Sequence, residues 1–189
     1  MPATWISSSD GSLERPTEPH LILVGLPGSG KTTLGKRIAK RLNRAFLDFD
    51  QEIERRHGMT VREIFAQHGE AHFRRSELEL TRELSHGGGM VLAPGGGWAA
   101  NEAAVALLRP PGRMMYLRIS PAVALRRMGR SRGDRPLLGV ADPIAELRRL
   151  LAIRERHYSA ADVVVDVEVI TRQRVIDAAV RLASAPLAD

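Results

Sequence analysis

The residues with the clearest chemical potential form one glycine-rich run near the start of the chain. It reads GLPGSGKT over residues 25–32 and matches the phosphate-loop pattern G-x-x-x-x-G-K-[ST] at every fixed position. Glycines in such a loop let backbone N–H groups converge on phosphate oxygens, and the N-terminus of a following helix adds favourable partial charge. A simple flexible turn would not require the Lys31-Thr32 pair. The run therefore predicts a site for nucleotide phosphates.

Within this loop, each residue type suits a particular contact. We expect Lys31 to contact the outer phosphates, and the hydroxyl of Thr32 to ligate a Mg²⁺ ion that bridges them. The residues expected to hold the nucleotide are Gly28, Ser29, Gly30, Lys31, Thr32 and Thr33.

Two acids, Asp48 and Asp50, follow a short apolar run at 45–47 that predicts a strand. Because side chains on a strand alternate, both carboxylates are expected to point the same way, toward the sheet edge that carries the phosphate loop. One could then hold Mg²⁺ while the other accepts a proton from an acceptor hydroxyl. The alternative is that both acids only begin and cap the next helix.

Arginines and bare backbone provide a second set of candidate ligands. On a predicted helix, Arg74 lies three residues before Glu77, so the acid can orient a guanidinium that binds a carboxylate through two hydrogen bonds. The run Gly95–Gly97 would bring backbone close to a small ligand, and Arg154 lies one helical turn before Tyr158. The alternatives are a solvated helix face for Arg74 and a flexible turn for the glycines.

The elements that must position these residues alternate along the chain. Apolar runs predict strands at 21–24, 45–47, 90–93, 114–119 and 163–165. Helical spacing and cap signals predict helices at about 31–42, 71–85, 101–108, 121–129, 142–158 and 174–183, with one more that ends near 57 and a short one that starts at 60. Strands alternating with helices in this way indicate a parallel sheet covered by helices on both faces.

The length of 189 residues fits one domain. We expect a mobile leader over 1–19 and a single domain over 20–189, with a helical substrate-binding region at about 50–85. The segment 129–141 is charged, bounded by glycines and without periodicity, which is typical of a mobile lid.

Composition narrows the class of protein further. A net charge of +6, carried almost wholly by arginine, favours anionic ligands, and the absence of cysteine excludes thiol nucleophiles and thiolate zinc sites. The arginines are dispersed and aromatic residues amount to 4% of the chain, which disfavours nucleic-acid binding. Neither an export signal nor a membrane-spanning run is evident, so we expect a cytoplasmic protein without a membrane partner.

The phosphate loop alone leaves the acceptor open. All three lysines lie between residues 31 and 40, so no guanine-reading Asn-Lys-x-Asp segment exists beyond the first helix, which argues against a GTPase. A large ATPase would need a longer chain. Kinases of nucleotides or small molecules remain.

Several motifs of the sequence together resemble those of the shikimate kinase family. The resemblance extends from about residue 20 to 166, and its motifs follow the family's order and spacing. They are GLPGSGKTTLG at 25–35, FLDFD at 46–50, IFAQHGEAHFRRSE at 64–77, GGG at 95–97, RPLL at 135–138 and RERHY at 154–158.

This resemblance implies a five-stranded parallel sheet between helical layers, as in P-loop kinases of the nucleoside-monophosphate-kinase type. It implies that Asp50 binds the acceptor hydroxyl and acts as base, while Arg74, Arg154 and the backbone of Gly95–Gly97 hold shikimate. It further implies that Thr32 and Asp48 serve Mg²⁺. Arg135 would stabilise the charge that develops as ATP donates its γ-phosphoryl group to the 3-hydroxyl of shikimate. A monomer is expected from the same resemblance.

Three alternatives stay open. Gluconate kinase resembles the chain in its phosphate loop but lacks the FRRSE, GGG and RPLL set, and a nucleoside monophosphate kinase must also seat a base. A non-catalytic ligand sensor of this fold would carry a helix-turn-helix region and need not keep its catalytic acid, whereas Asp50 and Arg135 are both present.

Overall fold

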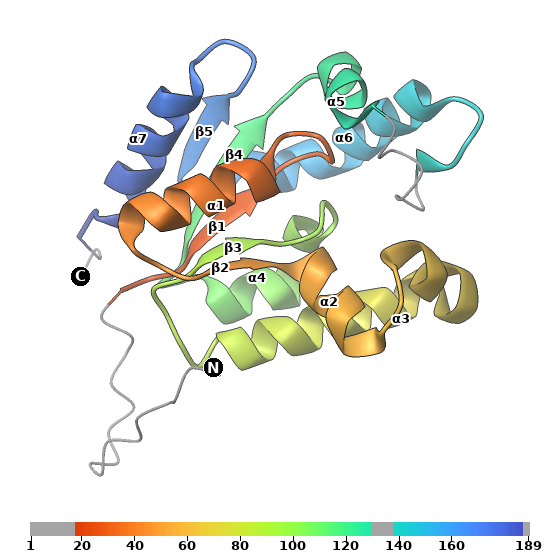
Figure 1. Ribbon diagram of the computed structural model, residues 1–189, viewed down its shortest axis with the longest axis horizontal. Helices are drawn as coiled ribbons and strands as arrows, with labels where there is room; N and C mark the ends of the chain where they lie inside the picture. Colours follow the sequence, from red (N-terminus) through yellow and green to blue (C-terminus); the bar gives the residue numbers. More distant parts are fainter. Residues whose placement is uncertain (1–17, 130–137, 187–189) are drawn as a thin grey trace.

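A computed structural model describes residues 18–129 and 138–186, and it contains one parallel sheet (Figure 1). The sheet has five strands in the order β2-β3-β1-β4-β5. Their bounds are β1 Leu21–Val24, β2 Phe46–Asp48, β3 Val91–Ala93, β4 Arg113–Arg118 and β5 Val163–Asp166. All pairings are parallel, as the alternation of strands and helices predicts.

Helices cover the sheet on both sides. Their bounds are α1 Lys31–Leu42, α2 Phe49–His57, α3 Val61–Leu84, α4 Glu102–Leu108, α5 Pro121–Met128, α6 Pro143–Ser159 and α7 Arg172–Ala183, with a short 3₁₀ helix η1 at Trp98–Ala100. Helices α1 and α7 pack together against one face, while α4 lies on the other face and packs against α3 (Figure 1). The expected three layers are confirmed.

The sheet is fully buried at its central strand, β1. All four of its residues are at most 3% exposed, and the strand is apolar throughout because both of its faces meet helices. Leu21 is in register with Val91 on β3 and with Arg113 on β4. The loops that follow β1 and β3 therefore leave the same edge of the sheet from neighbouring positions.

Local cap signals set the helix boundaries as expected. Thr60 and Glu63 form a reciprocal capping box at the start of α3, and Ser120 caps α5 with Pro121 in its first turn. The two helices expected between 60 and 85 run as one element, α3, that is broken at Gly69, where φ is 79°. Glycine adopts this left-handed conformation at little cost, so the break falls there.

The described chain begins at residue 18, two residues before the expected start of the domain at residue 20. Glu18 pairs with Arg44 at 3.1 Å, and its carbonyl accepts a hydrogen bond from the N–H of Gly89 at 2.7 Å. Leader residues 1–17 and lid residues 130–137 lie outside the described residues. Within the described part of the chain, no helix has the length and apolar character needed to cross a membrane.

Candidate active site

One cavity of about 840 Å³ brings the sequence-predicted residues together at the carboxyl ends of the strands. Thirteen of those residues line it: Gly28, Ser29, Gly30, Lys31, Thr32, Thr33, Asp48, Asp50, Arg74, Gly95, Gly96, Gly97 and Arg154. The phosphate loop and the candidate acceptor residues thus share a single space. Arg135 lies outside the described residues.

Three glycines of the phosphate loop, Gly25, Gly28 and Gly30, have a positive φ, and the last two lie in its turn. Gly28 has φ 82° and Gly30 has φ 95°. A Cβ on Gly28 would lie 2.5 Å from the carbonyl oxygen of Ala124, so a larger residue is excluded by backbone and not only by torsion. The loop can therefore approach α5 closely and leave its N–H groups at the start of α1.

Lys31 is folded across this loop. Its Nζ donates to the carbonyl of Gly25 at 2.8 Å and to that of Leu26 at 3.3 Å. The first turn of α1 contains no acidic residue, so both the ammonium and the helix N-terminus contribute positive charge to this part of the cavity. This arrangement suits an anionic ligand.

The geometry of the two aspartates corrects the sequence-based expectation. Asp48 ends β2 and serves as N-cap of α2, accepting from the backbone N–H of Asp50 and Gln51, so Asp50 lies in the first helical turn. Strand alternation therefore does not explain their shared direction. The capping alternative is correct for Asp48, yet both residues line the cavity because the cap turns the chain at the sheet edge.

Asp48 also contacts the phosphate loop. The hydroxyl of Thr32 donates to Asp48 Oδ2 at 2.6 Å, which places a hydroxyl and a carboxylate oxygen side by side. These hard oxygen donors fit Mg²⁺, which is usually bound by one or two protein ligands together with phosphates and water. Across the described residues, no group of three or more His, Cys, Asp or Glu side chains could hold a metal. The pair thus fits a metal that arrives with a nucleotide.

Arg74 is held in place by two acids on its own helix. Its Nη1 donates to Glu77 at 2.5 Å, while Nη2 donates to Glu70 at 2.8 Å. A Cβ on Gly97 would lie 2.7 Å from Nη2, so the guanidinium rests on bare glycine backbone. These contacts fix a planar donor group at the cavity wall, where it can bind a carboxylate.

Glu77 is the buried partner of this pair. Burial raises the pKa of Glu77 above its usual range, although the adjacent Arg74 opposes the shift. Burial alone would lower the pKa of Arg74, but Glu77 and Glu70 together raise it. Gly95 lies against the same carboxyl, since a Cβ there would be 2.5 Å from Glu77 Oε1 and 3.2 Å from Asp50 Oδ1. Glu77 thus adjoins both Arg74 and the glycine turn that faces Asp50.

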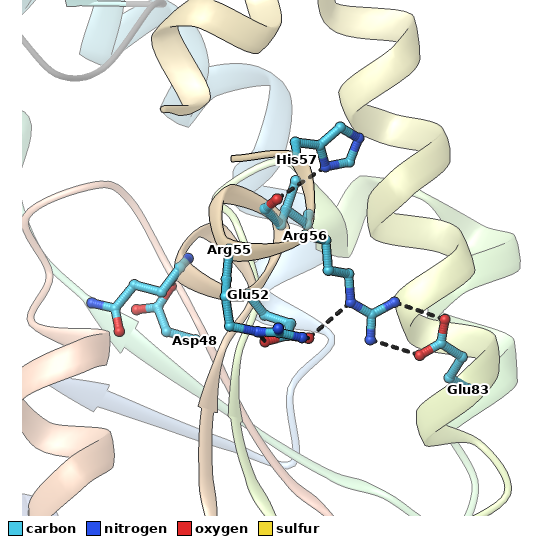
Figure 2. Close-up of polar contacts among 8 residues, drawn as sticks. Asp48, Glu52, Arg55, Arg56, His57 and Glu83 are labelled. Atoms are coloured by element: carbon cyan, nitrogen blue, oxygen red, sulfur yellow. Dashed lines mark hydrogen bonds and ion pairs between the residues drawn. The ribbon is translucent and has the colours of Figure 1, made fainter. Parts of the chain in front are cut away.

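A surface network joins the two helices that carry Asp50 and Arg74 (Figure 2). Arg56 on α2 donates to both carboxylate oxygens of Glu83 on α3 at 2.7 Å, and Glu52 accepts from both Arg55 and Arg56. These arginines lower the pKa of Glu52 to about 2. Exposed pairs contribute only about 0.2–1 kcal/mol each, so the network links α2 to α3 but adds little stability.

Sequence reasoning missed some supporting residues. Glu70 precedes Arg74 by four residues, a spacing that could have identified the second acid. The indole N–H of Trp98 donates to the buried hydroxyl of Thr81 at 3.0 Å, and no local pattern indicates this contact between α3 and η1.

Taken together, a phosphate loop on a five-stranded parallel sheet and an arginine-lined acceptor cavity define a P-loop kinase of small molecules. The comparisons make this specific: the chain belongs to the shikimate kinase family, whose model, described as shikimate kinase, matches residues 27–183.

Individual relatives agree. A shikimate kinase of Nitrobacter winogradskyi is 43% identical over 162 residues, covering 86% of this chain and 75% of the relative. A shikimate kinase of Caldanaerobacter subterraneus is 39% identical over 162 residues, covering 86% of this chain and 94% of the relative.

Solved structures support the same family. The shikimate kinase from Acinetobacter baumannii in complex with shikimate gives a TM-score of 0.82 at 36% identity, covering 88% of this chain and 93% of that one. A gluconokinase from Sinorhizobium meliloti gives a TM-score of 0.55 at 18% identity, which indicates a shared fold alone.

Proposed function

We propose that this protein transfers the γ-phosphoryl group of ATP to the 3-hydroxyl of shikimate, giving shikimate 3-phosphate and ADP. The observation that carries the proposal is the single cavity, which contains a phosphate loop, an aspartate and two arginines suited to a carboxylate. Membership of the shikimate kinase family supports the same acceptor. A cavity of about 840 Å³ has ample room for a small ligand beside nucleotide phosphates.

On the donor side, the loop N–H groups and Lys31 bind the phosphates of ATP. Thr32 and Asp48 would hold a Mg²⁺ ion that arrives with the nucleotide, and the ion would supply positive charge to neutralise the phosphates. We propose that the guanidinium of Arg135 stabilises the negative charge that develops on the γ-phosphoryl group during transfer. Most of the rate enhancement then comes from positioning and electrostatic stabilisation.

On the acceptor side, Arg74 and Arg154 bind the carboxylate of shikimate and the backbone of Gly95–Gly97 donates to its polar groups. Asp50 accepts the proton of the 3-hydroxyl as its oxygen attacks the γ-phosphorus. The bond from that phosphorus to the bridging oxygen of ADP breaks, and the electron pair leaves with ADP.

The proposal is tested by coupled ADP release with ATP and Mg²⁺, comparing shikimate with gluconate, nucleoside monophosphates and no acceptor. Release that depends on shikimate alone is the expected result. Release with another acceptor, and not with shikimate, would overturn the assigned substrate. If no acceptor stimulates release but shikimate raises the melting temperature, the protein is a ligand sensor and the catalytic proposal is wrong.

The proposed base is tested by Asp50→Asn, which removes the proton acceptor at nearly constant volume. We expect kcat to fall by a factor of about 10² to 10⁴, the usual range for a general base, with little change in melting temperature. Asp177→Asn on α7 is the matched control and should keep wild-type kcat. Normal turnover by Asp50→Asn would exclude Asp50 as the base.

A further inference from the structure

The turn formed by Gly95–Gly97 is tied to its surroundings by every one of its carbonyl groups. The carbonyls of Gly95 and Gly97 accept from the N–H groups of Trp98 and Ala100, at 3.0 and 3.1 Å. The remaining carbonyl, that of Gly96, accepts from the hydroxyl of Tyr158 on α6. Two of these three hydrogen bonds come from the adjoining helix η1, and the third comes from Tyr158, which is distant in the sequence.

The direction of the Gly96 carbonyl determines the direction of the next donor. In a trans peptide the C=O and the following N–H point in opposite directions within one plane. The bond between Gly96 and Gly97 is not among the cis peptides of the chain. Gly96 and Gly97 line the cavity whereas Tyr158 does not, so holding the carbonyl on Tyr158 keeps the N–H of Gly97 directed away from that side chain.

The glycines themselves do not fix the orientation of this peptide. Glycine tolerates both signs of φ, so a triplet of glycines can rotate a peptide plane at low cost. The hydrogen bond from Tyr158 to Gly96 O opposes such a rotation, because a flipped peptide would leave the buried Tyr158 hydroxyl without its acceptor. The tyrosine is 1% exposed, which leaves little water to replace it.

Tyr158 is itself held rigidly. Its ring lies on that of Tyr116, with centroids 5.1 Å apart and planes inclined by 34°. The hydroxyl of Tyr116 donates to Glu155 at 2.8 Å, so this second phenol is anchored to α6 and not to the glycine turn. The ring pair therefore fixes the position of one hydroxyl with respect to the cavity wall.

Arg154, one helical turn before Tyr158, also lies next to Gly96. Its guanidinium lies close enough to the Tyr158 phenol to oppose the rise that burial causes in the pKa of that phenol. A Cβ on Gly96 would lie 3.2 Å from Arg154 Nη1 and 3.5 Å from the Tyr158 hydroxyl oxygen, so all three groups converge. Arg154 is 8% exposed and depends on such partners for its orientation.

We propose that Tyr158 is a positioning residue for the acceptor, acting through the Gly96 carbonyl and the Arg154 guanidinium. Its hydroxyl sets the direction of the Gly97 N–H and of the arginine, and both then bind an anionic, hydroxyl-bearing ligand. The inference rests on the proposed function for the identity of that ligand. The orientation of the turn is a property of the protein without ligand.

The decisive variant is Tyr158→Phe, which keeps the ring stacked on Tyr116 and removes only the hydroxyl. We expect the KM for shikimate to rise about tenfold, while the KM for ATP stays within twofold of wild type. Tyr116→Phe is the matched control, because it removes a hydroxyl from the same ring pair that does not contact the turn. It should leave both KM values within twofold.

A ligand-free measurement separates this inference from the proposed function. Hydrogen exchange followed by mass spectrometry should show faster exchange over residues 95–100 in Tyr158→Phe than in wild type or Tyr116→Phe. If wild-type protein fails to use shikimate, the proposed function is wrong and the exchange result alone decides the role of Tyr158. Unchanged exchange, an unchanged KM for shikimate in an active enzyme, or equal effects of the two variants would each overturn the inference.

Discussion

The pair formed by Arg74 and Glu77 allows a quantitative test of how the acceptor cavity is organised. The contact is short, at 2.5 Å, and the Glu77 side chain is 3% exposed. Charge-assisted hydrogen bonds contribute about 1.5–3 kcal/mol. In Glu77→Gln the amide oxygen can still accept from Arg74, and Glu70 still binds the other edge of the guanidinium, so the loss should be near the lower limit. About 1.4 kcal/mol corresponds to a tenfold rise in the KM for shikimate.

The matched control is Glu70→Gln, which removes the other acid that contacts Arg74. The Glu70 side chain is 50% exposed, and its i,i+4 pair is worth about 0.3–0.5 kcal/mol, so the KM should rise about twofold. Both variants are assayed by coupled ADP release over a range of shikimate concentrations, with the KM for ATP measured in parallel. Equal effects of the two substitutions, or no effect of Glu77→Gln, would refute the reasoning from burial.

The same pair predicts a dependence on pH. Because burial raises the pKa of Glu77 above its ordinary value of 4.5, this carboxyl takes up its proton at a higher pH than an ordinary glutamate. Protonation weakens its hold on Arg74, so the KM for shikimate should increase as the pH falls toward that raised pKa. Glu77→Gln should lack this part of the increase. A parallel rise in both proteins would assign the effect to another group.

Two further predictions concern stability. Gly112→Ala would place a Cβ 2.4 Å from the carbonyl oxygen of Leu108, a clash with backbone. This clash should cost about 1–3 kcal/mol of stability and lower the melting temperature by several degrees, without changing the KM for shikimate or for ATP. An unaltered melting temperature would show that the backbone can shift at little cost. Burial lowers the pKa of His20, whose Nδ1 accepts from the N–H of Met90, so the neutral ring is favoured in the folded protein. The stability that this ring gives the fold is complete above pH 6.5 and should be lost as the pH falls below that value. His20→Gln should flatten the fall in melting temperature between pH 7 and 5, and an identical slope would remove His20 as its cause.

Features set by neighbouring residues could be predicted from the sequence. The phosphate loop, the capping box at Thr60 and the start of α5 at Ser120 each depend on residues within one or two helical turns. The acceptor residues were found because several motifs follow one family order, and the cavity does bring Arg74 and Arg154 together. Their catalytic roles remain predictions.

Features set by tertiary contacts could not be predicted. The contact from Tyr158 to Gly96 spans 62 positions, and no periodicity of either segment indicates it. A side-chain donor that meets a distant carbonyl depends on how the layers stack, which requires the folded structure.

The adjacency of β1 and β3 has a consequence for how substrate preference can change. These strands are hydrogen-bonded neighbours, and each leads into a glycine turn at the cavity. Neighbouring strands are spaced by about 4.8 Å, a distance imposed by backbone hydrogen bonds and indifferent to side-chain identity. The sheet thus fixes the separation between the phosphate loop after β1 and the glycine turn after β3. Substitutions on α2 and α3 can alter which molecule is seated without lengthening the path that the phosphoryl group must travel.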